Sequence, residues 1–241
     1  MFKKTNRLAA GLMATAAASV TVLSMTATGA QAATTFTPSG GPGANFVGSY
    51  NNPTDSPDLG IVSGIRFTDI PADQSLDCSA FSVGGSIVSP GTSRAYGANA
   101  GNLGSLTASG CTNPLAGATS VTPIGTWGVT VTGDAVSGQW PARLTNVKAK
   151  LSAANCDFYV EGVVNGKFNT STQVFTPVGN PVAANATSYT PTGLVIASTP
   201  APPTGSMCTT LDLQVGDDIG ITGTFKNTPP SGSTALAITN P

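Results

Sequence analysis

The chain has 241 residues, of which only 9% are charged, and it contains no histidine and a single glutamate, Glu161. Histidine is the side chain that titrates near neutral pH, so its absence excludes Ser-His-Asp and Cys-His catalysis and the zinc sites that require imidazole. We therefore expect a non-enzymatic protein with no catalytic residue, no bound cofactor and no metal.

Residues 1–32 have the pattern of a secretory signal peptide. Basic residues precede an uncharged, mostly apolar stretch over 8–25, and Ala30-Gln31-Ala32 supplies the small-x-small pattern that signal peptidase accepts. We predict cleavage after Ala32. The mature chain is then expected to be secreted, extracellular or held at the cell surface, with no membrane span.

The mature chain is mildly acidic. Residues 33–241 hold seven basic and eleven acidic side chains, a net charge of −4. So few basic residues could not neutralise a run of phosphates, which argues against nucleic acid as a partner. Low charge combined with alternating Thr, Val and Gly is typical of a β-rich exported protein rather than of a disordered chain.

Four cysteines remain after cleavage: Cys78, Cys111, Cys156 and Cys208. An even count in an exported chain indicates two disulfides, for which three connectivities are possible. We favour Cys78–Cys111 and Cys156–Cys208, because each bridge then closes a loop within its own half of the chain. A redox or metal site is disfavoured, since no Cys-x-x-Cys pair and no histidine is present.

Short stretches of alternating polarity recur between Gly- and Pro-containing turns. These predicted strands cover residues 59–67, 76–88, 105–111, 123–132, 135–142, 144–152, 156–168, 173–178, 194–198, 209–215 and 219–225. The pattern predicts an all-β fold, an antiparallel β-sandwich or small barrel of about ten strands stapled by two disulfides. Residues 97–105 are predicted to form a glycine-rich loop.

The chain divides into four predicted parts. Residues 1–32 are the signal peptide, and residues 33–56, rich in Gly, Pro and Asn, form a flexible N-terminal arm. A single all-β domain covers residues 57–226. Residues 227–241 contain Pro229-Pro230 and are predicted to be a mobile tail.

Alternation within the strands predicts which side chains share a face of the sheet. Trp127 and Trp140 flank a predicted hairpin, where packing on one sheet face is favoured over a ligand platform. The predicted shared faces are those of Trp127, Val129 and Val131, of Phe158, Val160, Gly162 and Val164, and of Val147, Ala149 and Leu151, with Leu144 on the opposite side.

Acidic residues offer a possible calcium site. Asp69, Asp73 and Asp77 are spaced by four residues, and Asp217 and Asp218 are adjacent. Carboxylates in loops bind Ca²⁺, but the glycine and the bidentate glutamate of a calcium-binding loop are missing. Local hydrogen bonds in turns are therefore the favoured role of these residues.

Two further kinds of chemistry need Glu161. With Asp157 it could form the carboxylate pair of a glycoside hydrolase, but it alternates out of phase with its apolar neighbours and is expected on the solvent face. With Lys148 or Lys150 and Asn227 it could form an internal isopeptide crosslink, which requires a buried lysine.

Several motifs carry a resemblance to a known group of proteins. They are Cys111-Thr-Asn-Pro-Leu115, Gly125-Thr-Trp127, the strand 144–151, Cys156 with the strand 162–168, Cys208, and the stretch 216–225. In these motifs the chain resembles small secreted actinobacterial proteins of unknown function, which are distantly similar to secreted activators of alkane oxidation. The resemblance implies an all-β, disulfide-stapled extracellular protein, with no catalytic residues.

These observations favour a non-enzymatic secreted or cell-surface protein that acts by binding, adhesion or assembly. Its expected partners are cell-wall material, a second copy of itself or a small apolar ligand. The alternative is a carrier or facilitator of uptake for a small apolar molecule such as a hydrocarbon, bound between the sheets or inside the barrel. A glycoside hydrolase that uses carboxylates alone is the third possibility.

Overall fold

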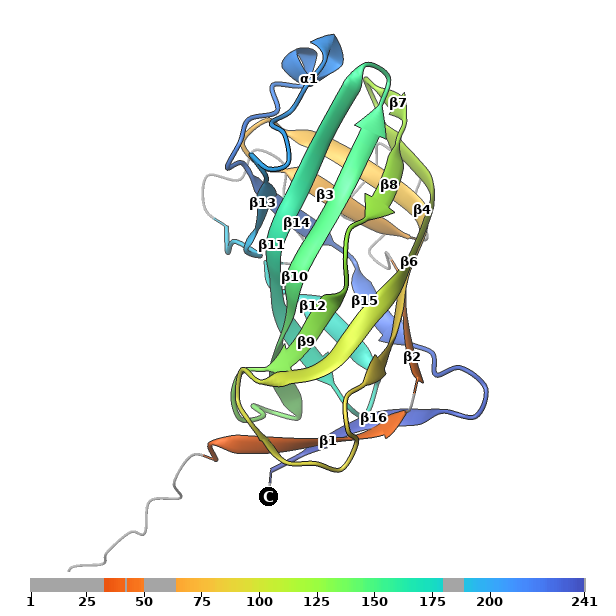
Figure 1. The fold of residues 1–241 in the computed structure, drawn as a ribbon, viewed down its shortest axis with the longest axis vertical. Coiled ribbons are helices and arrows are strands. Elements are labelled where there is room, and N and C mark those ends of the chain that lie inside the picture. The colour runs from red at the N-terminus through yellow and green to blue at the C-terminus, as the bar shows by residue number, and fades with distance from the viewer. Residues whose placement is uncertain (1–32, 42, 50–63, 180–188, 241) are drawn as a thin grey trace, which may run out of the picture. The chain divides into compact units, whose positions relative to one another are not determined.

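The computed structural model describes residues 33–41, 43–49, 64–179 and 189–240, all within one compact unit. Its regular secondary structure is nearly all β-strand, and every strand pairing in it is antiparallel (Figure 1). The predicted all-β class is therefore confirmed, and the alternation of apolar and polar residues that predicted it reflects sheets with one buried face. The predicted signal peptide 1–32 lies outside the described residues.

Four long strands of 14 or 15 residues form the walls. They are β4 (Gln74–Ile87), β6 (Asn99–Asn113), β10 (Gln139–Ala153) and β11 (Cys156–Asn169). β4 pairs with β6, and β10 pairs with β11, over almost their whole lengths. Shorter strands bridge these two long pairs on both sides.

The bridging strands form two tiers along the walls. The first tier consists of β2 (Gly43–Ser49), β9 (Trp127–Val131), β12 (Val174–Pro177) and β15 (Thr224–Asn227). The second consists of β3 (Ile65–Asp69), β8 (Ser120–Pro123), β13 (Leu194–Ile196) and β14 (Asp218–Thr222).

Hydrogen bonds close the first tier into a complete ring. The order β4-β6-β9-β10-β11-β12-β15-β2 returns to β4, which makes a closed eight-stranded barrel. In the second tier the route β4-β3-β14-β13-β11 joins the same walls. Of the two predicted architectures, the structure is therefore the barrel and not the sandwich.

Separate elements lie at the two ends of the barrel (Figure 1). At one end β1 (Thr35–Gly41), β5 (Arg94–Ala95) and β16 (Thr234–Thr239) form a three-stranded sheet. At the other end lie the short helix α1 (Ser206–Thr210) and β7 (Gly117–Ala118). We call these the β1 end and the α1 end.

The predicted flexible arm and mobile tail are wrong for the residues that the structure describes. In the arm, β1 pairs with β16 and β2 pairs with both β4 and β15. In the tail, β16 is the partner of β1. The arm and the tail complete each other's hydrogen bonds although they lie about 200 residues apart in the sequence, and so neither has the pattern of a stable strand when read alone. Residues 50–56 of the predicted arm lie outside the described part.

The predicted glycine-rich loop 97–105 also differs, because β6 already begins at Asn99. The facing strand β4 carries Gly84 and Gly85 at a register shift opposite this segment. A Cβ atom on Gly85 would overlap the carbonyl oxygen of Asn102. Gly85 is therefore required because the backbones of β4 and β6 approach closely at this point, and not because the chain turns.

A β-bulge corrects the predicted facing of strand β10. The register with β11 shifts between Leu144 and Val147, and Asn146 has a positive φ of 55°. The bulge reverses the alternation. As a result Leu144 points inward together with Val147 and Ala149, instead of lying on the opposite side. All three side chains line the barrel interior.

The predicted strand 209–215 is also wrong, because residues 206–210 form α1 and the chain then turns. Cys208 forms a disulfide with Cys156 and is buried beside Leu211. The amide of Leu211 donates to the carbonyl of Met207 at 2.9 Å. Helical spacing over this one turn places its apolar side chains against the end of the barrel, where an extended strand would leave half of them in solvent.

Both favoured disulfides are confirmed. Cys78–Cys111 joins the walls β4 and β6, and Cys156–Cys208 joins the start of β11 to α1. All four cysteines are buried. Each bridge therefore removes freedom from the unfolded chain while lying inside the packed structure.

The double variant Cys156→Ala with Cys208→Ala should lower the free energy of unfolding by about 4 kcal/mol, because the bridge closes a loop of 52 residues. Denaturant unfolding followed by circular dichroism measures this. Cys78→Ala with Cys111→Ala is the matched control, with a 33-residue loop and a similar expected loss. Unchanged stability of the first variant would contradict the view that this bridge holds α1 in place.

Candidate functional site

Two apolar cavities lie inside the barrel. The α1-side cavity has a volume of about 90 Å³, and the β1-side cavity has a volume of about 120 Å³. The side chains that line both, and so separate them, are Phe67, Phe81, Trp127, Val147 and Leu194. The two cavities are therefore neighbouring chambers of one interior.

Aromatic rings from different strands form much of the dividing wall and of the β1-side lining. Phe81 lies between Phe67 and Phe225, with ring centroids 5.3 and 5.9 Å away. Trp127 is buried, and its indole nitrogen donates to the carbonyl of Lys148 at 3.2 Å. Aromatic packing of this kind is rigid and leaves gaps that these rings cannot fill by small movements.

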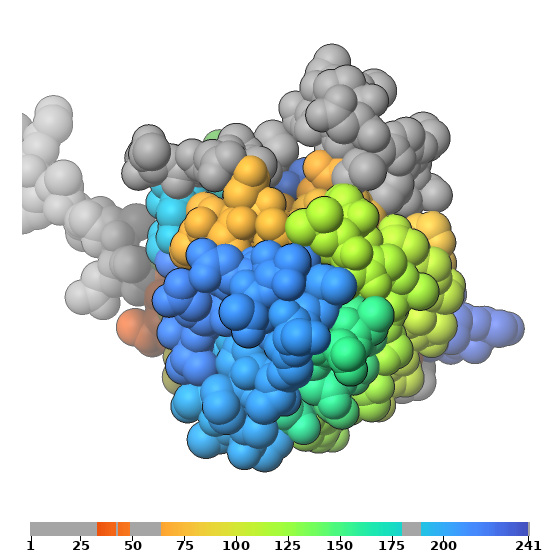
Figure 2. All heavy atoms as spheres, turned by 90° about the horizontal axis from the view of Figure 1, so that it is seen from above, coloured from red at the N-terminus to blue at the C-terminus, as the bar shows by residue number. Residues whose placement is uncertain are grey.

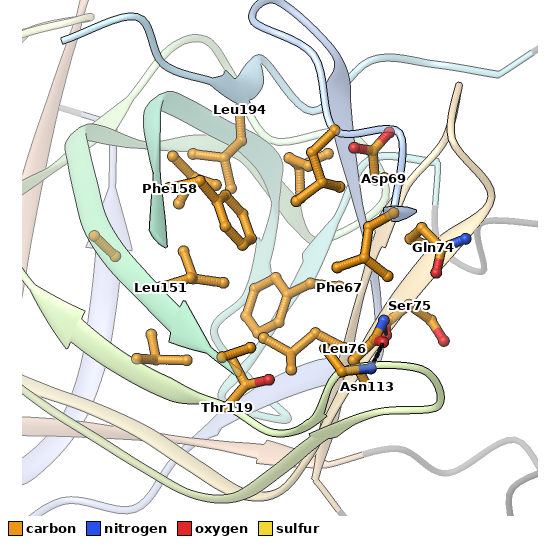
Figure 3. A pocket seen from close by; sticks show the side chains of 18 of the residues that line it. Phe67, Asp69, Gln74, Ser75, Leu76, Asn113, Thr119, Leu151, Phe158 and Leu194 are labelled. Atoms are coloured by element: carbon orange, nitrogen blue, oxygen red, sulfur yellow. Dashed lines mark hydrogen bonds between the residues drawn. The ribbon is translucent and has the colours of Figure 1, made fainter. Parts of the chain in front are cut away.

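Polar side chains gather along one edge of the α1-side cavity. Figure 3 shows Asp69, Gln74 and Ser75 on this edge, across from Phe158 and Leu151. These polar residues come from the end of β3 and the start of β4, whereas the apolar ones come from β10 and β11. The cavity is thus almost wholly apolar, with one polar margin.

Asp69 is the charged residue of this margin. Side chains alternate along a strand, so Asp69 shares the inner face of β3 with Ile65 and Phe67. Asp69 is only 5% exposed. Its Oδ1 accepts a hydrogen bond from the amide of Ala72 at 3.1 Å. Its Oδ2 has no hydrogen-bond partner among the residues that the structure describes.

The surroundings of Asp69 disfavour its charged form. Desolvation by burial is the main cause that raises the pKa of Asp69 to about 7, and the neighbouring carboxylates of Asp217 and Asp212 raise it further. The hydrogen bond from Ala72 acts in the opposite direction. Nearby, the Tyr189 hydroxyl donates to Asp218 at 2.6 Å, which raises the pKa of Tyr189 to about 12.

Both ends of the interior are covered. Seen from the α1 end, atoms of the segment around α1 (blue) cover the middle, beside the β3–β4 turn (orange) and the β6–β7 turn (yellow-green) (Figure 2). Leu211 and Leu213 of this segment line the α1-side cavity. At the opposite end, Pro38 and Ile238 of the three-stranded sheet line the β1-side cavity.

The acidic residues considered for calcium do not form a metal site. Asp77 forms a two-pronged ion pair with Arg66, at 2.6 and 3.1 Å, and its side chain is 3% exposed. Asp69 faces the cavity, and Asp217 accepts the amide of Gln214 at 2.8 Å. Within the described ranges, no group of three or more metal-ligating side chains could hold an ion.

The residues considered for glycoside hydrolysis or an isopeptide lie elsewhere. Glu161 pairs with Lys148 at 2.8 Å, and Asp157 pairs with Lys150 at 3.0 Å, all four side chains being at least 29% exposed. A hydrogen bond from Ser152, followed by the one from Lys150, lowers the pKa of Asp157. Asn227 instead bonds to Gln173 and to the amide of Asn45. Neither constellation forms.

Sequence reasoning placed most of the lining but not the role of Asp69. The shared faces of Trp127, Val129 and Val131, and of Phe158, Val160 and Val164, do line the interior. Asp69 continues the alternation of Ile65 and Phe67, and that pattern was the available signal. The alternation alone does not predict an inward-facing Asp69, because an acidic residue at the end of a strand usually begins a turn.

No family model, curated protein or solved structure matches this chain. No helix in the described part of the chain is long and apolar enough to cross a bilayer.

Replacing Asp69 with asparagine should remove a pH-dependent loss of stability. The unfolded carboxyl titrates near 3.8 and the folded one near 7, so the folded state binds more protons between these values. The free energy of unfolding of the wild type therefore falls as pH rises from about 4 to 7. An asparagine side chain is not ionisable in either state, so the variant Asp69→Asn lacks this fall and should melt about 3 °C or more above the wild type at pH 8.

Thermal melts at pH 4 and pH 8 measure this difference, and the amide oxygen of the variant can still accept the amide of Ala72. The control Asp134→Asn removes a carboxylate that bonds Tyr96 and Asn240, away from the cavity. If the melting temperatures of Asp69→Asn and of the wild type changed equally between pH 4 and pH 8, this result would contradict the buried state of Asp69.

Proposed function

We propose that this protein is an exported carrier that binds a small apolar molecule inside its barrel. The observation that carries the proposal is the pair of apolar chambers enclosed by the closed ring of strands. Export is supported by the signal-peptide pattern of residues 1–32 and by the two disulfides. From the sequence alone the carrier is the second hypothesis, and the cavities favour it over adhesion.

The size and polarity of the chambers support an apolar ligand. A water molecule needs about 10–15 Å³ of such space together with two to four polar partners. Chambers of about 90 and 120 Å³ hold several waters by volume, but their walls offer almost no partners. An apolar cavity of about 150 Å³ stays dry and binds benzene. Each chamber therefore suits a single ring or a short alkyl chain.

Assembly through strand edges is less well supported. Closure of the barrel leaves few unpaired edges. The outer edge of β16 is covered at Leu236, whose amide donates to the side-chain oxygen of Gln173 at 2.9 Å. The side-chain nitrogen of Gln173 donates in turn to the Leu236 carbonyl at 2.8 Å. The side-chain amide of Gln173 thus occupies the hydrogen-bonding groups that a neighbouring strand would use, and this hinders pairing of β16 with a second copy of the chain.

The motifs of the chain resemble small secreted actinobacterial proteins, which are distantly similar to secreted activators of alkane oxidation. This distant similarity supports the same type of ligand, since an alkane would fit walls of this chemistry. No catalytic residue is part of the proposal. A carrier holds its ligand by shape and by exclusion of water, which needs neither histidine nor a metal.

Movement of one cover would widen the path by which a ligand reaches the chambers. The cover at the α1 end is one short helix and the following turn, tethered through Cys156–Cys208. The cover at the β1 end is a sheet of three paired strands, held by many backbone hydrogen bonds. The α1 segment is the smaller of the two covers, and so it is the favoured route for ligand exchange.

Toluene should bind and stabilise the folded protein. At 100 times its dissociation constant, a ligand that binds only the folded state adds about 2.7 kcal/mol to the free energy of unfolding, or about 5–10 °C in melting temperature. Differential scanning calorimetry with increasing toluene measures this shift. A change in tryptophan emission gives an independent reading, because Trp127 borders both chambers.

Two cavity-filling variants provide the control. Ala149 lines only the α1-side cavity, and Ala142 lines only the β1-side cavity. The double variant Ala149→Leu with Ala142→Leu should fold and lose the toluene shift. A shift that persists in the double variant, or no shift in the wild type with toluene, benzene and hexane, would contradict the proposal.

A further inference from the structure

An apolar ligand alone does not account for Asp69. The side chain faces the α1-side cavity from the inner face of β3, and its Oδ2 has no partner among the described residues. A buried polar atom without a partner destabilises the folded state, and does so more strongly when it is charged. Natural structures seldom keep such an atom without a reason. A ligand that fills the cavity and also bonds to Oδ2 would remove this cost.

The charges around Asp69 select the kind of partner. Asp212 and Asp217, on the segment between α1 and β14, both disfavour the ionised form of Asp69. Asp218, the first residue of β14, accepts a hydrogen bond from the Tyr189 hydroxyl. Neither Asp218 nor Tyr189 can carry a positive charge. Among the residues that the structure describes, the titratable groups that face Asp69 are therefore acidic or phenolic. Such a field favours a cation and disfavours an anion.

We propose that the α1-side cavity binds a small primary amine with an apolar body, whose ammonium group pairs with Oδ2 of Asp69. This inference rests on the proposed carrier function and specifies its ligand. The apolar body would occupy the space between Phe158 and Leu151, and the ammonium group would lie at the polar margin (Figure 3).

An amine fits this site better than an alcohol does. A hydroxyl group can bond to Oδ2 but leaves the carboxylate charge uncompensated beside two other carboxylates. An ammonium group turns a single buried charge into a neutral pair, which costs far less to bury. Gln74 also lies on the margin, and its side-chain nitrogen already donates to the carbonyl of Ala72, which leaves its side-chain oxygen as a further acceptor.

Binding is coupled to a proton. Below pH 7 the free protein holds Asp69 mainly in its neutral form, so an incoming ammonium ion displaces the carboxyl proton into solvent. Above pH 7 the carboxylate is already ionised, and no proton is released. Amine affinity should therefore rise about tenfold from pH 6 to pH 8, as the ionised fraction of a group with a pKa near 7 rises.

The test compares benzylamine, benzyl alcohol and toluene, which share one ring and differ in the head group. Isothermal titration calorimetry at pH 8 should show benzylamine binding at least tenfold more tightly than either neutral ligand. At pH 6, titrations in buffers of different ionisation enthalpy should show release of close to one proton per benzylamine bound, and none for benzyl alcohol.

The variant Asp69→Asn separates this inference from the carrier function. It should lose at least tenfold in benzylamine affinity, lose the proton release and keep toluene binding. The control Asp134→Asn removes the same charge far from the cavity and should bind benzylamine as the wild type does. Toluene binding with no preference for benzylamine, or unchanged benzylamine affinity in Asp69→Asn, would overturn the inference and leave the carrier function standing. No binding of any of the three ligands would overturn both.

Discussion

The hydrogen-bonded closure of the strand ring is the constraint on which the rest of this structure depends. Eight strands fix the width of the interior, and the strands cannot move inward to fill space that their side chains leave empty. Two adjacent chambers remain because the inward side chains include alanines beside rigid aromatic rings. The short helix at one end and the small sheet at the other convert this open tube into an enclosed interior.

The same enclosure accounts for the behaviour of Asp69. A carboxylate at the end of a strand is ordinarily hydrated, but Asp69 is buried here, at a cavity that the cover formed by the α1 segment also lines. Its neighbours Asp212 and Asp217 lie on that cover, so the element that buries Asp69 also supplies charges that raise its pKa. A ligand that neutralises the Asp69 carboxylate would therefore also change the electrostatic repulsion between Asp69 and the cover. Ligand binding and movement of the cover are coupled in this way.

Local patterns predicted the elements whose partners are near in sequence. The alternation in 123–132 and 156–168 correctly identified the inward faces of β9 and β11, since a strand's facing depends only on its own residues until a bulge intervenes. The bulge after Leu144 reversed one such face. The strands β1, β2 and β16 were missed because each is stabilised by a partner far away in the chain. The segment around Cys208 was predicted wrongly because a disulfide and end-on packing favoured a helical turn.

The sequence by itself determined the chemical inventory: an all-β chain, four cysteines that indicate two disulfides, and no histidine for acid–base or metal chemistry. It favoured the pairing of the cysteines within their own halves, and the structure decided it. Only the tertiary structure decided that the sheet closes, that the interior keeps two chambers and that Asp69 faces one of them. The physical reason is that a cavity is the volume left between side chains from distant segments. Likewise, the desolvation of a carboxyl group depends on what surrounds it, and no pattern along the chain records those surroundings.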